Sequence, residues 1–395
     1  MNPRLAALIL SLLVCRRASA QFRDDFESLK TDPEGIAGWA FFAGDGTATM
    51  DLRQGGEGYA SILVDATTDK RGIWWALVDR RVSDRLEVGL LQKPGHELRI
   101  EARIRLSHAP RRVNLQVARQ GSTDDYAHLM EFDIPDAETW HTISMTTHGF
   151  EARPEDALIG HLALMDWGLE KYRVDLDYIK VDIVDPLTAG PDQGAPVPYH
   201  PAIADPRSFT QEVRVVQDSM IDVENTDVNL NDWSVQAEGR RTRLVSVGGS
   251  HYGILRWDLG AFAGKKVAGH GLLELTTHFV ERKAPDVKDF GIVRVVEILG
   301  GDPHWDQASV TTDSLCHYQP LSQVLNPQMI IDWPITEGDG GKTYLTISRP
   351  VLQRLIDGRA LGLALKPLGA IRAAFYAMEE EGGGHSARLR FNLEQ

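Results

Sequence analysis

The proline-rich stretch from Asp185 to Pro206 limits what this chain can fold into more than any other part of the sequence. It holds six prolines and two glycines in twenty-two residues. Proline has no backbone N–H and fixes φ, so neither a helix nor a central strand runs through such a segment. The composition predicts an extended, semi-rigid linker over 186–206. The 395 residues of the chain are enough for a domain with its own core on each side.

The first twenty residues have the pattern of a signal peptide. Arg4 precedes an apolar run, Leu5–Val14, and Ala18-Ser19-Ala20 forms a small-residue cleavage site. The apolar run is too short to span a bilayer. An uncleaved anchor helix and a lipoprotein attached through Cys15 are the alternatives. We therefore expect a secreted or periplasmic protein that begins at Gln21 and does not insert into a membrane.

Charge and cysteine content exclude several kinds of partner and site. The formal net charge is −14, and removal of the signal peptide takes away three arginines and no acid, which gives −17. Such a protein repels phosphate, so we expect no nucleic-acid partner, although a local basic groove for an acidic sugar stays open. Cys316 is then the single remaining cysteine. We expect it to be a buried apolar residue, and we expect no disulfide framework or cysteine-based metal site.

The pattern of residues 21–185 predicts strands separated by turns. In 96–106, apolar residues at every second position alternate with charged ones, which is the period of a strand with one face in water. Further strands are expected at 112–119, 127–134, 140–147, 158–167 and 173–185. No long helical period interrupts them. The region is therefore predicted to be an all-β sandwich or jelly roll.

Several short motifs of this first domain occur in a recognisable order. They are DDFES (24–28), Gly38-Trp39, KPGHEL (93–98), TWHTISMT (139–146) and DLDYIKVDI (175–183). Together they resemble the galactose-binding-like jelly rolls of family 4/9 carbohydrate-binding modules. One departure is Leu98, which stands where an aromatic residue is common in that family. The resemblance covers essentially the whole domain and implies a sugar-binding jelly roll.

The resemblance also implies a structural calcium ion between the first and last strands. The matching carboxylates are Asp25, Glu27 and Asp177. Calcium prefers several hard oxygen ligands, which carboxylates supply. The alternative is a solvated acidic edge without metal. No organic cofactor is expected.

The family binds sugars on a sheet face or at a loop edge, where aromatic rings stack on sugar rings and polar groups bind hydroxyls. Either Trp74 or Trp75 must point outward if this segment is a strand. Alternation places Gln116 on a face with Asn114, and Tyr126 and His128 on a face with Met130. Core tryptophans and a structural His128 are the alternatives. The candidate residues in the first domain are Trp74, Trp75, Arg80, Gln116, Arg119, Tyr126, His128 and Trp167.

The region 207–395 predicts a second set of strands with one short helix. Strands are expected at 211–225, 253–259, 272–277, 292–298 and 360–369, followed by a last hairpin within 375–394. The helix is expected from Arg349 to Asp357, with Ser348 as its N-cap and Gly358 at its end. One short helix among many strands still predicts a β-sandwich.

The order of motifs in this region resembles the DNRLRE-type domain, grouped with family 96 carbohydrate-binding modules. The motifs include LRWDL (255–259), GKKV (264–267), TISRPVLQRLIDG (346–358), LGLALKP (361–367) and ARLRFNL (387–393). The chain departs from the family at Ala377-Met378-Glu379, where Ser-Arg-Glu is usual. The resemblance implies a second jelly roll in a secreted, polysaccharide-degrading setting, with acidic glycans among the ligands. The candidate carbohydrate-binding residues here are Trp233, His251, Tyr252 and Tyr376.

The sequence contains no GxSxG, P-loop, HExxH or dinucleotide-binding motif, so catalysis is not indicated by a motif. A polysaccharide lyase is one enzymatic alternative, because such enzymes combine a neutralising Arg or Gln with a Tyr or His base and acid. Gln116, Arg119, Tyr126 and His128 supply those residue types on two predicted adjacent strands. A glycoside hydrolase would need two carboxylates across a cleft, and the sequence alone pairs none.

The sequence therefore predicts a secreted, all-β protein with two jelly-roll sandwiches, at 21–185 and 207–395. The expected function is binding of a polysaccharide, neutral or acidic, as part of polysaccharide breakdown. The alternatives are a lyase that acts by β-elimination on a uronic-acid glycan, and a cell-surface adhesion or structural protein.

Overall fold

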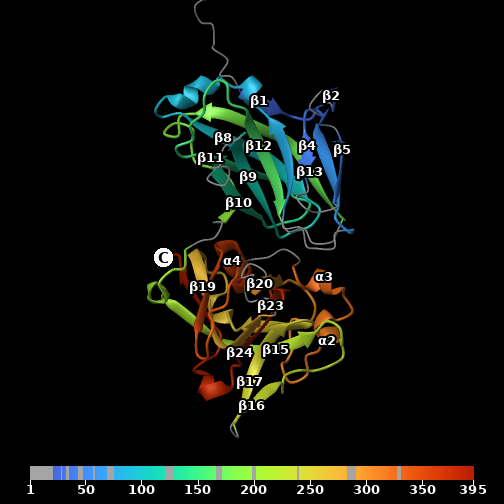
Figure 1. Cartoon of the computed structure of the whole chain (residues 1–395), viewed down its shortest axis with the longest axis vertical. Helices are drawn as coiled ribbons and strands as arrows, with labels where there is room; N and C mark the ends of the chain where they lie inside the picture. The colour runs from blue at the N-terminus through green and yellow to red at the C-terminus, as the bar shows by residue number, and fades with distance from the viewer. Residues whose placement is uncertain are drawn as a thin grey trace, which may run out of the picture. The chain divides into compact units, whose positions relative to one another are not determined.

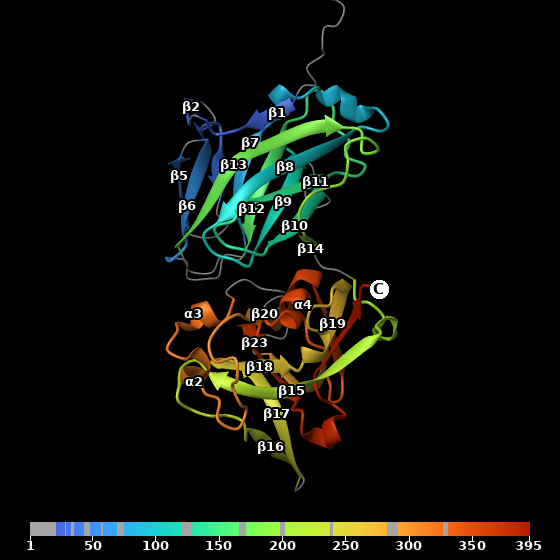
Figure 2. The same cartoon turned by 180° about the vertical axis from the view of Figure 1, so that it is seen from behind.

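The computed structural model describes residues 21–27, 29–32, 35–42, 48–56, 58–68, 75–120, 128–165, 171–197, 202–237, 240–282, 291–326 and 331–395. The chain divides into two compact units, Met1–Pro196 and Val197–Gln395. Antiparallel strands make up most of each unit (Figures 1 and 2), so the predicted all-β class with two β-sandwich domains is confirmed. Within the described ranges, no helix has the length and apolar character of a membrane span.

The first unit contains two six-stranded antiparallel sheets in its described part. The first sheet has the order β11 (His141–Thr146), β8 (Glu97–Leu106), β13 (Lys171–Val184), β6 (Tyr59–Asp65), β5 (Thr49–Gly56), and β1 (Gln21–Asp24) also pairs with β13. The second sheet has the order β14 (Pro196–Val197), β10 (Leu129–Ile134), β9 (Arg111–Arg119), β12 (Leu158–Met165), β7 (Trp75–Arg81), β4 (Ala40–Phe42). A short ribbon joins β2 (Thr31–Asp32) to β3 (Gly35–Ile36).

The core of this unit lies between the two sheets, as alternation predicts. The apolar residues of β8, from Leu98 to Leu106, are buried and belong to one apolar cluster with Val113, Leu115 and Val117 of β9. Trp39, from the early Gly-Trp motif, is also part of this core, and its Nε1 donates a 2.8 Å hydrogen bond to Asp24. The motif therefore has a packing role, because it anchors the first strand to the sandwich.

The first half of the proline-rich segment is part of the first unit and is not a free linker. Arg99 is buried and donates hydrogen bonds to the carbonyl groups of Ala189, Gly190 and Pro191, at 2.7–3.1 Å. Asp192 accepts hydrogen bonds of 2.9 Å from the backbone N–H and the hydroxyl of Thr146. Arg99 on the sheet thus satisfies backbone carbonyl groups of a segment whose prolines keep it from pairing as a strand. Composition alone does not predict these contacts.

The second unit is built around one continuous set of eleven strands in its described part. Ten strands follow in the order β16 (Ser234–Ala237), β17 (Arg240–Gly248), β24 (Ile371–Tyr376), β19 (Val267–Arg282), β25 (Arg388–Leu393), β15 (Gln211–Asp222), β18 (His251–Trp257), β23 (Gly362–Gly369), β20 (Gly291–Ile298), β21 (Ile331–Trp333), and β22 (Lys342–Ile347) pairs with β19. The strands expected to form a final hairpin are β24 and β25, but the hairpin prediction is wrong, because β19 lies between them and pairs with both.

Three short α-helices accompany these strands among the described residues. The expected helix is α4 (Arg349–Ile356), although the side chain of its N-cap, Ser348, makes no capping hydrogen bond. The pattern did not predict α2 (Thr312–Cys316) or α3 (Leu321–Val324). Residues of both helices join a second apolar cluster around Trp305, in which Cys316 is buried. Burial raises the pKa of the Cys316 thiol, which fits the expected packing role.

A buried ion pair crosses the second unit from α4 to β20. Arg354 Nε and Nη2 donate to Glu297 Oε1 and Oε2 at 2.7 and 3.0 Å, and both side chains are almost completely buried. Asn326 donates a further hydrogen bond of 3.2 Å to Glu297 Oε2. The bidentate geometry compensates the cost of taking two charges out of water.

Candidate functional site

The second sheet of the first unit carries a row of polar side chains on the face turned away from the core. Leu115 of β9 and Leu162 of β12 are opposite each other and face the core, so their neighbours face the other way. Cross-strand pairing then places Asp79, His161 and Gln116 side by side on β7, β12 and β9. We name this surface the polar face. Its residues are Asp79, Arg112, Asn114, Gln116, Glu131, Asp133 and His161.

The side chains of the polar face are unusually well buried for the outer side of a sandwich. Asn114 is 1% exposed, Glu131 2%, and His161 and Gln116 each 8%. Polar groups removed from water need hydrogen-bond partners, since an unsatisfied group costs roughly 1–3 kcal/mol. Each buried polar atom on this face therefore needs a hydrogen-bond partner.

Two buried atoms at the centre of the polar face have no hydrogen-bond partner among the residues that the structure describes. They are His161 Nδ1 and Asn114 Oδ1. Gln116 is directly opposite His161, and Asn114 is two residues from Gln116 on the same strand. Burial lowers the pKa of His161 to about 4, so its imidazole is neutral at neutral pH and has one donor and one acceptor nitrogen. Both atoms are also shielded from solvent, so a ligand that satisfies them would first have to displace the groups that cover this point.

Charge on the polar face is confined to its two sides. On one side, Arg112 Nη1 donates a 3.3 Å hydrogen bond to Glu131 Oε2, and both side chains are buried. On the other side, burial raises the pKa of Asp79. Among the described residues, the centre carries only amide and imidazole groups, which suit an uncharged ligand rich in hydroxyl groups.

The structure does not bring together Gln116, Arg119 and His128, which are the described residues among the four expected for a lyase. Gln116 is opposite Leu129, so His128 falls on the other side of the sheet, where its ring lies 4.8 Å from that of the core residue Phe150. Arg119 donates a 2.7 Å hydrogen bond to the carbonyl group of Glu151. Tyr126 lies outside the described residues. A one-residue offset between neighbouring positions is enough to separate Gln116 from His128, because side chains alternate between faces.

The other sugar-binding candidates of the first unit fall into two groups. Trp74 and Trp167 lie outside the described residues, and Trp75 is described only as the first residue of β7, opposite Met165. Arg80 points to the core side, where its guanidinium lies 5.6 Å from the ring of Phe22 and donates a hydrogen bond to the carbonyl group of Ala37. Arg80 therefore supports packing and is not part of the polar face.

The three carboxylates expected to bind calcium do not fit a metal site. Asp177 lies at a register shift in β13 and forms a 2.7 Å ion pair with Arg103. Asp25 and Glu27 are exposed after β1. In the part of the chain that the structure describes, no three His, Cys, Asp or Glu side chains are grouped so that they could hold a metal ion. The positive charge of Arg103 beside Asp177 opposes the binding of a cation there.

The candidates of the second unit have different surroundings. Tyr376 Oη donates a 2.6 Å hydrogen bond to Asp339, and Trp233 has the guanidinium of Arg372 at 5.7 Å from its ring. His251 Nε2 is 3.6 Å from Asp222 Oδ2. Tyr252 is partly buried against the cluster around Trp305, with Lys366 Nζ at 5.4 Å from its ring. Trp233 also packs against the apolar cluster of Met220, Val245 and Ala377, so all four candidates are partly buried and make structural contacts.

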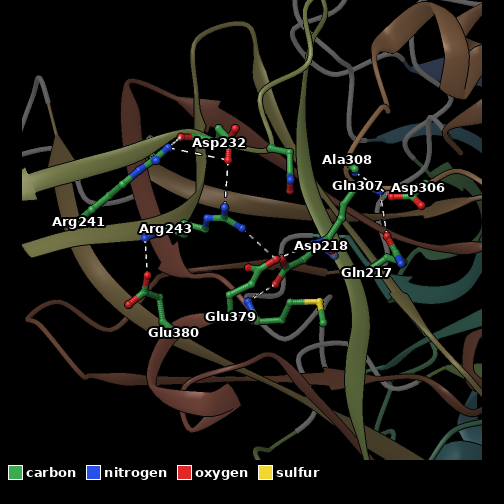
Figure 3. A network of polar contacts seen from close by, with 12 residues as sticks. Gln217, Asp218, Asp232, Arg241, Arg243, Asp306, Gln307, Ala308, Glu379 and Glu380 are labelled. Atoms are coloured by element: carbon green, nitrogen blue, oxygen red, sulfur yellow. Dashed lines mark hydrogen bonds and ion pairs between the residues drawn. The ribbon is translucent and has the colours of Figure 1, made fainter.

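A network of polar contacts in the second unit, which we name the Asp218 cluster, joins four segments far apart in sequence (Figure 3). Asp218 of β15 is 3% exposed, and its Oδ2 accepts a 2.8 Å hydrogen bond from the N–H of Met378. Glu379 Oε1 accepts 2.5 Å from Gln307 Nε2 and lies 3.7 Å from Arg243 Nη1. The cluster fastens the loop at 303–310 and the segment after β24 to β15 and β17.

Sequence reasoning did not select His161, Asp79 or Glu131. A signal for His161 was present, since it is a lone histidine in the otherwise apolar strand 158–165. Alternation along this strand assigns it to the face opposite Leu162. Its position beside Gln116 depends on the pairing of β12 with β9, which the sequence does not give.

Comparisons with family models and with curated proteins give no match. Among solved structures, the chain is similar to the CBM22-1–GH10 modules of a Clostridium thermocellum endo-1,4-β-D-xylanase in complex with xylohexaose (14% identity, 41% of this chain and 28% of that chain, TM-score 0.28). It is also similar to a CBM22-1–CBM22-2 tandem domain from Paenibacillus barcinonensis (12% identity, 94% and 95% covered, TM-score 0.29). A third is the family 11 carbohydrate-binding module from Clostridium thermocellum in complex with a mixed-linked tetrasaccharide (16% identity, 41% and 95% covered, TM-score 0.26). These TM-scores are too low to support a conclusion about the fold or the ligand of this chain.

Proposed function

We propose that the first unit binds a polysaccharide on its polar face, which makes the chain a carbohydrate-binding protein. The observation that carries this proposal is the pair of buried atoms without a partner, His161 Nδ1 and Asn114 Oδ1, at the centre of that face. A fold without a ligand gains nothing from two such atoms, because each costs free energy. Unsatisfied groups that persist in a well-packed sheet are typical of binding sites.

Sugars suit this face because a hydroxyl group both donates and accepts hydrogen bonds. The face offers the amide of Asn114, the amide of Gln116 and the neutral imidazole of His161 as partners. A sugar hydroxyl can donate to Asn114 Oδ1, and a neighbouring hydroxyl can bond to the imidazole. These few polar side chains, held at fixed positions on the sheet, would orient the bound sugar.

The test is affinity gel electrophoresis of residues 21–395 with a panel of neutral and uronic-acid polysaccharides. We expect retardation by at least one polymer, and we expect His161→Ala and Asn114→Ala each to weaken binding about tenfold, since one hydrogen bond to a buried group contributes about 1 kcal/mol or more. His96→Ala is the matched control, because His96 is a histidine of the same unit that bonds to Pro94 and lies outside the polar face. Retention of full binding by both face variants would contradict the proposal.

Export is a further part of the proposed function. Residues 1–20 carry the signal pattern but lie outside the described residues. N-terminal sequencing of the protein recovered from the medium or periplasm is expected to begin at Gln21. A protein recovered with Met1 would contradict export through a cleaved signal.

A polysaccharide lyase is a second candidate, and the position of His161 beside Gln116 favours it. In such a reaction a neutral histidine removes the proton next to a uronic carboxylate, which an amide binds. The bond from the neighbouring carbon to the glycosidic oxygen breaks as a carbon–carbon double bond forms, and the leaving oxygen takes up the proton from the imidazolium. The test is the ultraviolet absorbance of the unsaturated product with the uronic-acid polymers. A rise that is lost in His161→Ala supports the lyase. Binding without any rise supports a binding protein. The absence of both binding and a rise in absorbance supports an adhesion role.

A further inference from the structure

The outer face of β24 and β19 in the second unit carries a row of partly exposed rings, which the residue before β16 and the loop before β25 extend. We name this row the aromatic band, and its members are Trp233, His278, Phe279, Arg372, Tyr376 and His385. Five of the six are rings and the sixth is an exposed arginine. Soluble proteins seldom leave such a row of rings at the surface without a use for it.

Strand register explains why these residues share one face. On β24, Ala373 and Phe375 point into the core, so Arg372 and Tyr376 point outward. Phe279 of β19 is opposite Ala374, which places it on the outer face between them. A register shift at His278 puts two consecutive rings of β19 on this side.

The rings contact each other along the band. The ring of Tyr376 lies 4.7 Å from that of His385 in a stacked arrangement and 5.2 Å from that of His278. His278 in turn lies 5.8 Å from Phe279. The guanidinium of Arg372 lies 5.4 Å from Phe279 and 5.7 Å from Trp233, so it joins the two ends. The contacts hold the rings in fixed positions, which reduces the entropy lost when a ligand stacks on them.

Polar groups accompany the band and are themselves paired. Asp339 Oδ1 accepts 2.6 Å from Tyr376 Oη and lies 3.0 Å from His278 Nδ1, and its side chain is 65% exposed. Arg372 lies 3.7 Å from Glu281 across the strands. Arg372 therefore has an acidic neighbour, and the described residues of the band carry no excess of positive charge to attract an anion.

We propose that the aromatic band is a second carbohydrate-binding site, specific for an uncharged glycan that lies across the strands. The apolar faces of sugar rings stack on Trp233, Phe279 and Tyr376, and the exposed carboxylate of Asp339 accepts hydrogen bonds from hydroxyl groups. The balanced charges on either side favour a neutral polymer over a uronic-acid polymer. This site uses residues of the second unit alone, so it does not depend on the polar face of the first unit.

The test is affinity gel electrophoresis of residues 21–395 with xylan, mixed-linkage β-glucan and alginate. Trp233→Ala and Tyr376→Ala are combined with His161→Ala, so that the second unit is measured without the polar face. We expect the His161→Ala protein to retain binding to a neutral polymer, and each added band substitution to weaken that binding about tenfold or more. Tyr318→Ala is the matched control, because Tyr318 is a fully exposed tyrosine outside the band. Circular dichroism confirms folding, and Phe279→Ser is a further variant if one of the others does not fold.

The outcomes separate this site from the first one. Loss of neutral-polymer binding in the band variants but not in Tyr318→Ala supports the band. Binding that is unchanged in the band variants overturns it. Loss of all binding in His161→Ala alone also overturns it, while that result supports the polar face. Binding to alginate alone, lost in Arg372→Gln, overturns the assignment to an uncharged glycan.

Discussion

The carboxylates of Asp218 and Glu379 lie close together in the second unit, and the first is buried (Figure 3). Burial and, to a smaller extent, the negative charge of Glu379 raise the pKa of Asp218 to about 7, although the hydrogen bond from Met378 opposes the shift. Arg243 lies 3.7 Å from Glu379, so its positive charge offsets the negative charge of Glu379 more than that of Asp218. Asp218 therefore keeps its proton in the folded protein at pH values where it is ionised in the unfolded chain.

The stability of the second unit is expected to fall as the pH rises from 4 to 7. The pKa of Asp218 is 3.8 in the unfolded reference and about 7 in the folded protein. The stabilising proton is fully bound below the lower value and is lost as the pH passes the higher one. The difference in unfolding free energy is on the order of 4 kcal/mol. Calorimetric unfolding between pH 4 and pH 8 measures it.

Asp218→Asn is expected to remove this pH dependence, because the amide resembles the protonated acid. At pH 8 the variant should unfold at a higher temperature than the wild type, and Asp84→Asn, at an exposed carboxylate of the first unit, should not. An unchanged slope in Asp218→Asn would show that another group is responsible.

The first unit is expected to have the opposite pH dependence because of His161. Burial lowers the pKa of His161 from 6.5 to about 4. For a base with a lowered pKa, stability is fully present above 6.5 and is lost as the pH falls towards 4. The loss is on the order of 3 kcal/mol. Nuclear magnetic resonance of the imidazole should show no titration between pH 5.5 and pH 8, and titration near pH 6.5 would contradict burial of the ring.

Asn114→Leu is expected to stabilise the first unit while it weakens glycan binding. The substitution removes the buried Oδ1 that has no partner and replaces it with an apolar group of similar size. Urea unfolding should show a gain of about 1 kcal/mol. Lower stability in Asn114→Leu would mean that the amide is satisfied in solution without a ligand, which would contradict the proposed role of Asn114 Oδ1.

Arg99 is expected to control the order of residues 186–195. The guanidinium bonds to three carbonyl groups and to Ser144 Oγ, which a lysine cannot reproduce with one ammonium group. Arg99→Lys should therefore increase hydrogen exchange of the amides at 187–195, measured by mass spectrometry. Arg53→Lys, at an exposed arginine of β5, is the control. Equal protection in Arg99→Lys and the wild type would indicate that the prolines alone fix this segment.

Removal of one partner of the buried ion pair is expected to destabilise the second unit strongly. Arg354→Met leaves Glu297 charged and buried, which typically costs about 3–5 kcal/mol. The double variant Arg354→Met/Glu297→Gln should recover much of this loss because no charge stays buried. A double-mutant cycle from urea unfolding gives the coupling free energy. Additive effects would show that the two side chains do not interact.

The sequence alone determined the all-β class, the position of most strands and the faces that point to the core. These properties depend on local patterns, since a period of two places Leu98 and Ile100 on one side whatever strand lies next to them. The short helix at 349–356 could also be predicted from the local sequence, because Pro350 and Gly358 mark its ends. For the same reason Gln116 and Asn114 were correctly placed on a common face.

Only the tertiary structure decided which residues meet. His161 is opposite Gln116 because β12 pairs with β9, and His128 falls on the core side because of the register of β10. Arg99 binds the proline-rich segment about ninety positions later in the chain. Part of the predicted linker therefore belongs to the folded first unit. Such contacts depend on strand pairing and register between distant segments, which are set by the free energy of the whole fold and leave no local pattern in the sequence.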